Sequence, residues 1–215
     1  MKLKITIAVL LVVIVGTIFL LKSNNNGGEV MAAAESTTKV NSGKKVLVAY
    51  FSRTGNQYSV GNITEGNTAI IAKMIAEKTG GDLFEIKVVK DEYPEDHMKM
   101  IEYAKQEKNN NKRPAIIGKV NNFSDYDVIF VGYPNWWADL PMPVYTFLES
   151  YDFKGKTVIP FCTHEGSGLS GTERNVKATT KADVKEGLAI YGHVAQNSRT
   201  EADKKVSDWL KELGL

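Results

Sequence analysis

Cysteine and histidine are scarce in this chain, and their scarcity excludes several kinds of site. Cys162 is the only cysteine among 215 residues, so no disulfide can form within the chain and no cysteine cluster can hold a metal. The three histidines are scattered along the sequence and do not form a credible set of metal ligands. The sequence therefore predicts no metal site.

An excess of charge is also missing from most of the chain. Residues 41–215 contain 23 basic and 23 acidic residues, so the net charge of +2 comes entirely from residues 1–40. A neutral domain without a basic stripe provides no electrostatic attraction for nucleic acid. We therefore expect no nucleic-acid partner.

Long apolar runs are absent apart from one near the N-terminus. An unbroken apolar run extends from Ile5 to Leu21, with Lys2 and Lys4 before it and Lys22 after it. At about 1.5 Å per residue its helix would span roughly 26 Å, just enough to cross a hydrocarbon core about 30 Å thick. The sequence thus predicts a signal anchor or signal peptide over residues 1–22, followed by a flexible polar spacer over residues 23–43.

The charges around the apolar run predict its orientation. Positive charge lies mainly before the run, so we expect a single-pass protein of the cell membrane with its C-terminal domain outside the cytoplasm. No cysteine lies directly after the run, which excludes a lipoprotein anchor. The segment Ala32–Ala34 resembles a cleavage site but lies well beyond the run. We favour an uncleaved anchor, and the alternative is a secreted protein whose signal is cleaved.

From residue 44 onward, short β-rich runs alternate with amphipathic helical stretches. Strands are predicted over residues 45–52, 83–89, 127–132, 157–162 and 187–191, and Pro160 is the one residue that weakens the fourth. Helices are predicted from Asn67 to the Gly80-Gly81 stop and over residues 94–108, 143–150, 172–181 and 201–213. This alternation predicts an α/β domain over residues 44–215, with a doubly wound, five-stranded parallel sheet and three layers.

The loop after the first strand has the composition of a phosphate site. It holds Ser52, Arg53, Thr54, Gly55 and Asn56, and after ten more residues Asn67 and Thr68 open the helix. Hydroxyl groups, backbone N–H groups and a helix N-terminus together favour a phosphate dianion. The Gly-Lys-Ser/Thr ending of a nucleoside-triphosphate loop is missing, which argues for a monophosphate bound without metal. An ordinary turn with a helix cap is the alternative interpretation.

Two adjacent tryptophans mark the loop after the third strand. The sequence there is Pro134-Asn135-Trp136-Trp137 within a loop bounded by prolines. Two exposed indole rings are costly to leave in water, and their flat faces suit a planar aromatic ligand. The alternative for one of the two is that it seals the interface between helix and sheet.

The loop after the fourth strand is rich in small residues. It contains Thr163, His164, Glu165, Gly166, Ser167 and Gly168, and small residues let the backbone approach the edge of a ligand closely. Gly166, Gly168 and Gly171 match the spacing of a dinucleotide fingerprint. That fingerprint belongs after the first strand of its unit, so we do not assign it here.

These three motifs, in this order, resemble a flavodoxin-like family of bacterial proteins, and the resemblance covers the chain from about residue 44 to its end. It implies a flavodoxin-like fold that binds FMN without a covalent bond. By this resemblance the phosphate would be held by Ser52, Thr54, Asn56, Asn67 and Thr68. The isoalloxazine ring would lie beside Pro134, Asn135, Trp136 and Trp137, and its other edge would lie along Thr163 and residues 165–168, with Arg53 and Gly55 in the phosphate loop.

The sequence departs from the common flavodoxin pattern in two ways. Residues 57–66 are inserted into the phosphate loop, which leaves open whether Asn56 or Asn67 contacts the phosphate. The domain is also neutral, whereas electron-shuttle flavodoxins are strongly acidic. Less negative charge around a bound flavin favours its reduction, so we expect a less strongly reducing flavin.

Three functional hypotheses follow. The favoured one is an FMN-dependent oxidoreductase that passes electrons from a donor, such as NAD(P)H, to a quinone-like or other small acceptor. The second is a flavodoxin-type electron carrier that docks to protein partners. The third is a hydrolase or binding module that uses His164, Cys162 or His193. The cofactor carries the chemistry in the first two hypotheses, so we assign no catalytic residue.

Overall fold

A parallel sheet forms the centre of the domain in the computed structural model, which describes residues 43–215. Its strands lie in the order β4-β1-β5-β6-β7, and β8 pairs with the same edge of β6 as β7 does. The strands are β1 (Val46–Tyr50), β4 (Asp82–Glu85), β5 (Val128–Pro134), β6 (Thr157–His164), β7 (Asp183–Val184) and β8 (Leu188–Tyr191). Every pair in this sheet is parallel. The chain winds outward in one direction from β1 and in the other from β5, so the predicted doubly wound sheet is confirmed.

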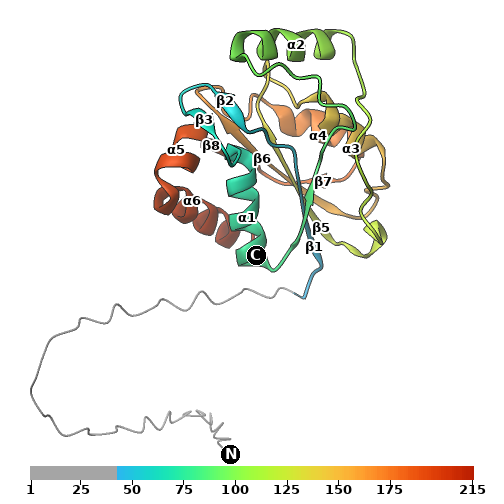
Figure 1. Ribbon diagram of the computed structural model, residues 1–215. Coiled ribbons are helices and arrows are strands. Elements are labelled where there is room, and N and C mark those ends of the chain that lie inside the picture. The colour runs from blue at the N-terminus through green and yellow to red at the C-terminus, as the bar shows by residue number, and fades with distance from the viewer. Residues whose placement is uncertain (1–42) are drawn as a thin grey trace, which may run out of the picture. The chain divides into compact units, whose positions relative to one another are not determined.

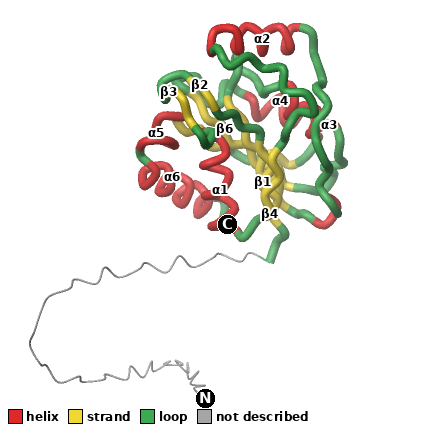
Figure 2. The backbone as a smooth tube through the Cα atoms, in the orientation of Figure 1, coloured by secondary structure: helices red, strands yellow, loops and turns green. Residues whose placement is uncertain are grey.

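Helices cover both faces of the sheet, as Figures 1 and 2 show. One face carries α1 (Asn67–Thr79), α5 (Gly192–Asn197) and α6 (Arg199–Glu212). The other carries α3 (Met142–Glu149) and α4 (Thr172–Thr180), while α2 (His97–Asn109) lies at the end of the domain where β1 ends. Alternate residues of β1 belong to two separate cores, with Val46 and Val48 in one and Leu47 and Ala49 in the other. This two-sided burial explains why the predicted strands are apolar throughout.

The predicted anchor at residues 1–22 and nearly all of the spacer lie outside the described residues. Within residues 43–215, no helix has the length and apolar character needed to cross a membrane.

The second strand is shorter than the sequence predicts. The prediction of a strand over residues 83–89 is wrong beyond Glu85, where β4 ends. The partner strand β1 ends at Tyr50, whose carbonyl accepts the N–H of Ile86 at 2.7 Å. Past that point residues 87–89 pair instead with residues 115–117 in antiparallel fashion, through the Val88–Ile116 bridge.

Pro160 lies in the middle of β6, a position at which a proline ordinarily removes one ladder hydrogen bond. The carbonyl of Val158 accepts the N–H of Lys185, on the side of β6 where β7 and β8 lie. Because the backbone groups of alternate residues in a strand face the same side, the Pro160 nitrogen faces that edge of β6 too. That edge is broken between β7 and β8, directly beside Pro160. A β-carbon on Gly187 would lie 2.9 Å from the Pro160 carbonyl, so a glycine stands at the break. The missing donor therefore costs no ladder hydrogen bond.

A short antiparallel hairpin over residues 55–63, which was not predicted, overlaps the inserted residues 57–66. It consists of β2 (Gly55–Gln57) and β3 (Gly61–Ile63). Helix α5, the strand β7 and a 3-10 turn at Phe123–Asp125 were also not predicted. The hairpin lies near the start of α1, at the edge of the sheet where the predicted loops meet.

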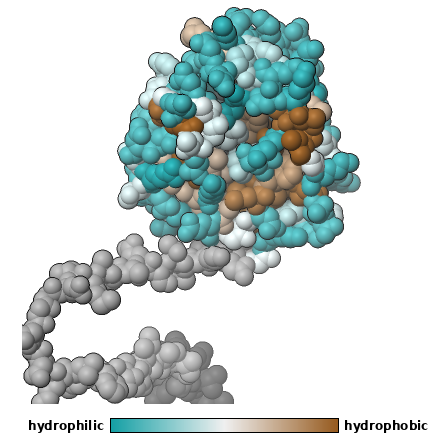
Figure 3. All heavy atoms as spheres, viewed as in Figure 1, coloured by the Kyte–Doolittle hydropathy of each residue, from teal (hydrophilic) through white to brown (hydrophobic). Residues whose placement is uncertain are grey.

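The surface is mostly polar, with a few apolar regions. Figure 3 shows a larger apolar patch on the side of the domain where α3 lies. The large apolar side chains left exposed among residues 43–215 are Tyr58, Leu83, Val89, Met98, Ile117, Trp137 and Tyr191.

Gly132 should be intolerant of any side chain. It lies in β5, and a β-carbon built on it would come within 2.1 Å of the Phe161 ring, which is fully buried. We expect Gly132→Ala to lower the free energy of unfolding by about 1–3 kcal/mol through overpacking. Chemical denaturation measures this change.

The double variant Gly132→Ala with Phe161→Leu is the control, because the smaller side chain makes room for the methyl group. We expect the two changes together to cost less than the sum of their separate effects. Strict additivity would contradict the proposed clash.

Candidate functional site

The three predicted loops meet at the carboxyl edge of the sheet. The Thr68 hydroxyl, at the start of α1, lies 2.8 Å from the Thr163 hydroxyl at the end of β6, and both groups are buried. The N–H of Asn135 donates to the Thr163 carbonyl at 2.9 Å. The side chain of Asn135 donates to the Gly168 carbonyl at 2.6 Å. Segments far apart in the sequence are thus bonded directly to one another.

The start of α1 has the features of an anion site. Gly66 caps the helix without a side-chain hydrogen bond, and the first turn contains no acidic residue. The Ser52 hydroxyl accepts the N–H of Ala69 at 3.1 Å, which holds the loop after β1 against the helix. A β-carbon on Gly66 would lie 2.2 Å from that hydroxyl oxygen, so only glycine permits this approach. Backbone N–H groups and hydroxyl groups are therefore gathered at the positive end of a helix dipole.

The side chain of Arg53 is engaged elsewhere. Its guanidinium donates to the Asp91 carboxylate at 2.9 Å and lies 4.8 Å above the Tyr93 ring. The Arg53 side chain therefore binds the segment after β4. Only the backbone of Arg53 is left to contact a phosphate.

The structure separates the roles of Asn56 and Asn67. Asn56 belongs to the hairpin, where it pairs with Asn62 and is exposed. Asn67 is the first residue of α1, lines the cavity described below and accepts the Gln196 amide at 2.9 Å. Of the two, Asn67 lies at the helix start where an anion is favoured.

A cavity of about 310 Å³ extends from Asn67 along the ends of β5 and β6. Its size is at the lower end of the range for small-molecule pockets. Aromatic rings form part of its wall: the rings of Tyr58 and His97 are stacked, with centroids 5.7 Å apart and planes at 21°. The lining residues are Gln57, Tyr58, Asn67, His97, Met100, Ile101, Pro134, Asn135, Trp136, Trp137, Thr163, His164, Glu165 and Ser167.

The two tryptophans have different surroundings. Trp136 packs edge-on against the rings of Phe51 and Tyr93, at centroid distances of 5.5 and 5.4 Å. Trp137 is 44% exposed, donates its indole N–H to the Ile101 carbonyl, and has the Lys105 ammonium 4.8 Å from its ring centre. Trp136 therefore joins the aromatic packing of the interior, while Trp137 is more exposed, and both residues line the cavity.

Two polar atoms on lining residues are buried without a partner. The Asn135 amide nitrogen donates to Gly168 and Ser170, which fixes the orientation of the amide, yet its carbonyl oxygen accepts no hydrogen bond. The Nδ1 atom of His97 is likewise buried and unpaired. Unsatisfied buried polar atoms are rare in native proteins and are expected where a ligand completes the bonding.

Glu165 is held firmly from α5. Its carboxylate accepts the backbone N–H of His193 at 2.8 Å and lies 2.7 Å from the His193 ring nitrogen. A β-carbon on Gly192 would lie 2.8 Å from this carboxylate and 2.3 Å from the Asn67 amide, so glycine is required there. The next residues, Gly166 and Gly168, have φ angles of 116° and 60°, which other residues rarely adopt.

Cys162 does not have the surroundings of a nucleophile. Its side chain is buried, and burial raises the pKa of its thiol to about 12. A thiol in this state stays protonated near neutral pH. Within residues 43–215 no cluster of histidine, cysteine and carboxylate side chains is suited to hold a metal ion.

Five lining residues from the hairpin and from α2 were not predicted, namely Gln57, Tyr58, His97, Met100 and Ile101. Only the tertiary fold brings these segments to the ends of β5 and β6. The exposed aromatic residue within the insertion was the one available signal.

A family model described as flavodoxin matches residues 45–212 of the chain. A solved structure from Bacteroides eggerthii, provisionally described as a flavoprotein, is 32% identical with a TM-score of 0.64. The alignment covers 80% of this chain and 99% of that one. A similarly described protein from Bacteroides uniformis is 32% identical over 78% of this chain and 98% of its own, with a TM-score of 0.62.

A third structure is a flavoprotein from Lactobacillus acidophilus in complex with FMN. It is 22% identical, with coverage of 73% of this chain and 99% of that chain and a TM-score of 0.53, and so shares the fold. No curated protein matches the chain.

His164 should make stability depend on pH. Burial lowers the pKa of its imidazole, the Glu165 carboxylate raises this pKa, and the His193 ring lowers it further. Since the folded state disfavours the charged ring, the protein loses stability as pH falls from about 6.5 through the lowered pKa. His164→Asn keeps an acceptor for the N–H of Gly166, which now donates to Nδ1 at 2.9 Å, but cannot titrate.

We expect the loss of stability between about pH 7.5 and 5.5 to be smaller in this variant than in the wild type. Urea denaturation at several pH values measures the difference. Parallel curves for the two proteins would contradict the assignment.

Proposed function

This chain belongs to the flavodoxin family, and on that basis we propose that it binds FMN at the carboxyl edge of the sheet and uses it in electron transfer. The observation that carries the proposal is one continuous site: a helix start capped by glycine, with no acidic residue in its first turn, at one end and an aromatic-walled cavity at the other. A phosphate on a flexible chain with a flat aromatic ring matches both parts.

The residues at the start of α1 fit the phosphate. The hydroxyls of Ser52 and Thr68 and the side chain of Asn67 surround backbone N–H groups at the positive end of the helix. No lysine is needed to balance a monophosphate here, because the helix dipole contributes about 0.3–1 kcal/mol and each charge-assisted hydrogen bond about 1.5–3 kcal/mol.

The residues along the cavity fit the ring. Trp137 and the stacked pair of Tyr58 and His97 supply flat apolar surface, and the unpaired carbonyl of Asn135 supplies an acceptor for a ring N–H. The glycines after β6 allow backbone groups to approach the other edge. A polar, planar heteroaromatic ring uses all of these features together.

Bound FMN would accept electrons or a hydride from a donor and pass them to an acceptor. The chain itself orients the cofactor through the loops after β1, β5 and β6. Trp136 and Tyr93 pack behind the site and exclude water from its inner side. The outer rim stays open, because Tyr58 is 63% and Trp137 44% exposed.

An oxidoreductase acting on a quinone-like acceptor is the form of this function that we favour. The open aromatic rim offers room and stacking surface for a second flat molecule beside the cofactor. An electron carrier is the second candidate, because the same rim, with Met98 68% exposed, also offers an apolar surface to a protein partner.

The location of the protein is part of this proposal. We infer from the apolar run over residues 5–21 that the N-terminus anchors the domain to the outer face of the cell membrane. Membrane fractionation, with protease treatment of intact cells, tests this arrangement. Recovery of the protein in the cytoplasmic fraction would refute it.

Purification of the full-length protein in detergent tests the function directly. We expect a yellow protein that releases FMN on denaturation. Rapid bleaching by NADH or NADPH with turnover of a soluble quinone identifies an oxidoreductase, whereas slow bleaching without turnover identifies a carrier. A colourless protein that FMN does not reconstitute would sink the proposal.

Trp137 should contribute to the affinity for FMN. We expect Trp137→Ala to weaken FMN binding by about 2- to 12-fold, through the loss of a stacking surface worth roughly 0.5–1.5 kcal/mol. Fluorescence titration of the apoprotein with FMN measures the change. Met98→Ala is the matched control, because Met98 is also exposed and apolar but does not line the cavity. Equal affinities for the two variants would contradict the role of Trp137.

A further inference from the structure

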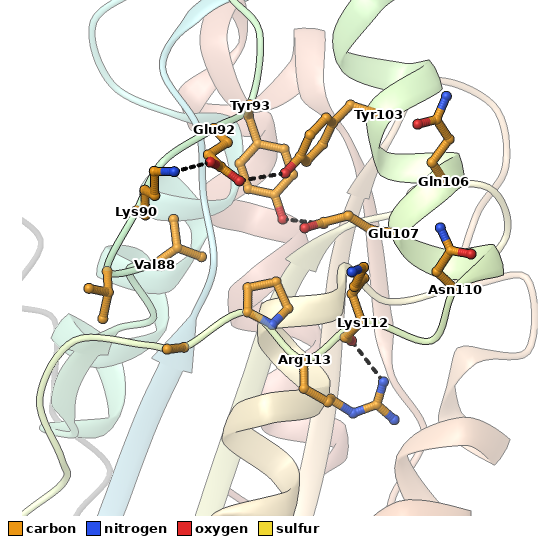
Figure 4. Close-up of a pocket in the computed structure, with 13 residues that line it drawn as sticks. Val88, Lys90, Glu92, Tyr93, Tyr103, Gln106, Glu107, Asn110, Lys112 and Arg113 are labelled. Carbon is orange, nitrogen blue, oxygen red and sulfur yellow. Dashed lines mark hydrogen bonds and ion pairs between the residues drawn. The ribbon is translucent and has the colours of Figure 1, made fainter.

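A second and larger cavity, of about 430 Å³, lies behind the predicted site. Residues 88–93, the second half of α2 and residues 112–115 form its walls, as Figure 4 shows. Tyr93 separates it from the first cavity: its ring packs against Trp136 with centroids 5.4 Å apart, and its hydroxyl faces the second cavity. Nothing in the proposed FMN site uses this space.

Most charged side chains around this cavity are neutralised. Lys90 is paired with Glu92, and Arg113 holds Glu149 through two hydrogen bonds of 2.7 Å. Glu107 and Lys112 are different, because neither makes an ion pair with any residue in 43–215. One unpaired group of each sign therefore lines the same cavity, on neighbouring walls (Figure 4).

The carboxyl group of Glu107 is the more unusual of the two. The residue is only 9% exposed, and the Tyr93 hydroxyl, which donates to it at 2.6 Å, is its one polar side-chain partner in the described chain. Burial raises the pKa of this carboxyl group, the Tyr93 bond lowers it, the Glu92 charge raises it, and the Lys112 charge lowers it. A buried carboxylate is costly when its nearby cation, Lys112, makes no ion pair with it, and a ligand that brings an ammonium group into hydrogen-bond distance lowers that cost.

We propose that this cavity binds a small zwitterion of the α-amino-acid type, with its ammonium group on Glu107 and its carboxylate on Lys112. The remaining walls suit an apolar side chain. Val88, Val89, Pro114 and Ala115 provide aliphatic surface, and the Tyr93 and Tyr103 rings, 5.4 Å apart, provide aromatic surface beside the carboxyl group.

Charge balance selects this class of ligand over others. A simple cation would be attracted by Glu107 but repelled by Lys112. A simple anion would be attracted by Lys112 but repelled by Glu107. A molecule with both charges on neighbouring atoms satisfies both residues at once. The inference does not depend on FMN binding, since the cavity is a separate one.

Isothermal titration of the full-length protein with L-leucine, near pH 7 and with FMN added, tests the proposal. N-acetyl-leucine lacks the ammonium charge and leucine amide lacks the carboxylate. We expect leucine to bind and each blocked derivative to bind at least about 10-fold more weakly. L-phenylalanine serves as a second zwitterion with an aromatic side chain. No binding of either amino acid, or equal binding of the blocked derivatives, would overturn the proposal.

Variants assign the contacts. We expect Lys112→Gln and Glu107→Gln each to weaken leucine binding by at least about 10-fold. Lys119→Gln is the matched control, because Lys119 is likewise an exposed lysine but does not line the cavity. Circular dichroism establishes that each variant is folded, and if Glu107→Gln does not fold, Lys112→Gln decides. Unchanged leucine affinity in a folded Lys112→Gln or Glu107→Gln protein would refute the two-point contact.

Discussion

The pairing of β1 with β5 is the contact on which the rest of the structure depends. These strands lie side by side in parallel register, from Val46 opposite Val128 to Tyr50 opposite Gly132. The chain leaves them in opposite directions across the sheet, so the loops after β1 and β5 separate at one edge and leave room between them. The end of β6 and the loop after it close that space from the side, because Asn135 donates to the carbonyls of Thr163 and Gly168. The loops that hold the predicted phosphate and ring contacts after β1 and β5 are therefore positioned by one pair of buried strands.

Much of this arrangement was predictable from the sequence. Strands buried on both faces are apolar throughout, so β1, β5 and β6 were predicted as strands, and glycine pairs and prolines marked the ends of helices. The three site loops were predicted because their composition is unusual for simple connections. The end of β4 was not predicted, because residues 86–89 are as apolar as a strand requires. Only the length of β1 shows where the pairing of β4 must stop. The break opposite Pro160 is likewise a tertiary property, since it depends on which side of β6 the proline nitrogen faces.

The candidate site was predictable in part for the same reason. Residues at strand ends converge by geometry, so Asn67, Asn135, Thr163 and Glu165 were predicted to lie together. The contributions of the hairpin and of α2 depend on how these segments fold back over the edge, and no local pattern specifies that. The different surroundings of Trp136 and Trp137 could also not be predicted from the local sequence, because the two residues are identical and only the tertiary fold gives them different contacts.

The bond between Gln196 and the start of α1 has a consequence for the order in which this protein can mature. The Gln196 amide donates to the Glu65 carbonyl and to the Asn67 side chain, and Glu65 is also held by Arg199. These partners are separated by 129 to 134 residues. A chain that emerges from its N-terminus first cannot complete the helix start until its last two helices have emerged. Contacts of such long range are slow to form, because the entropy of closing a long loop must be overcome first. Assembly of the cofactor site is thus a final step that reports a fully synthesised domain.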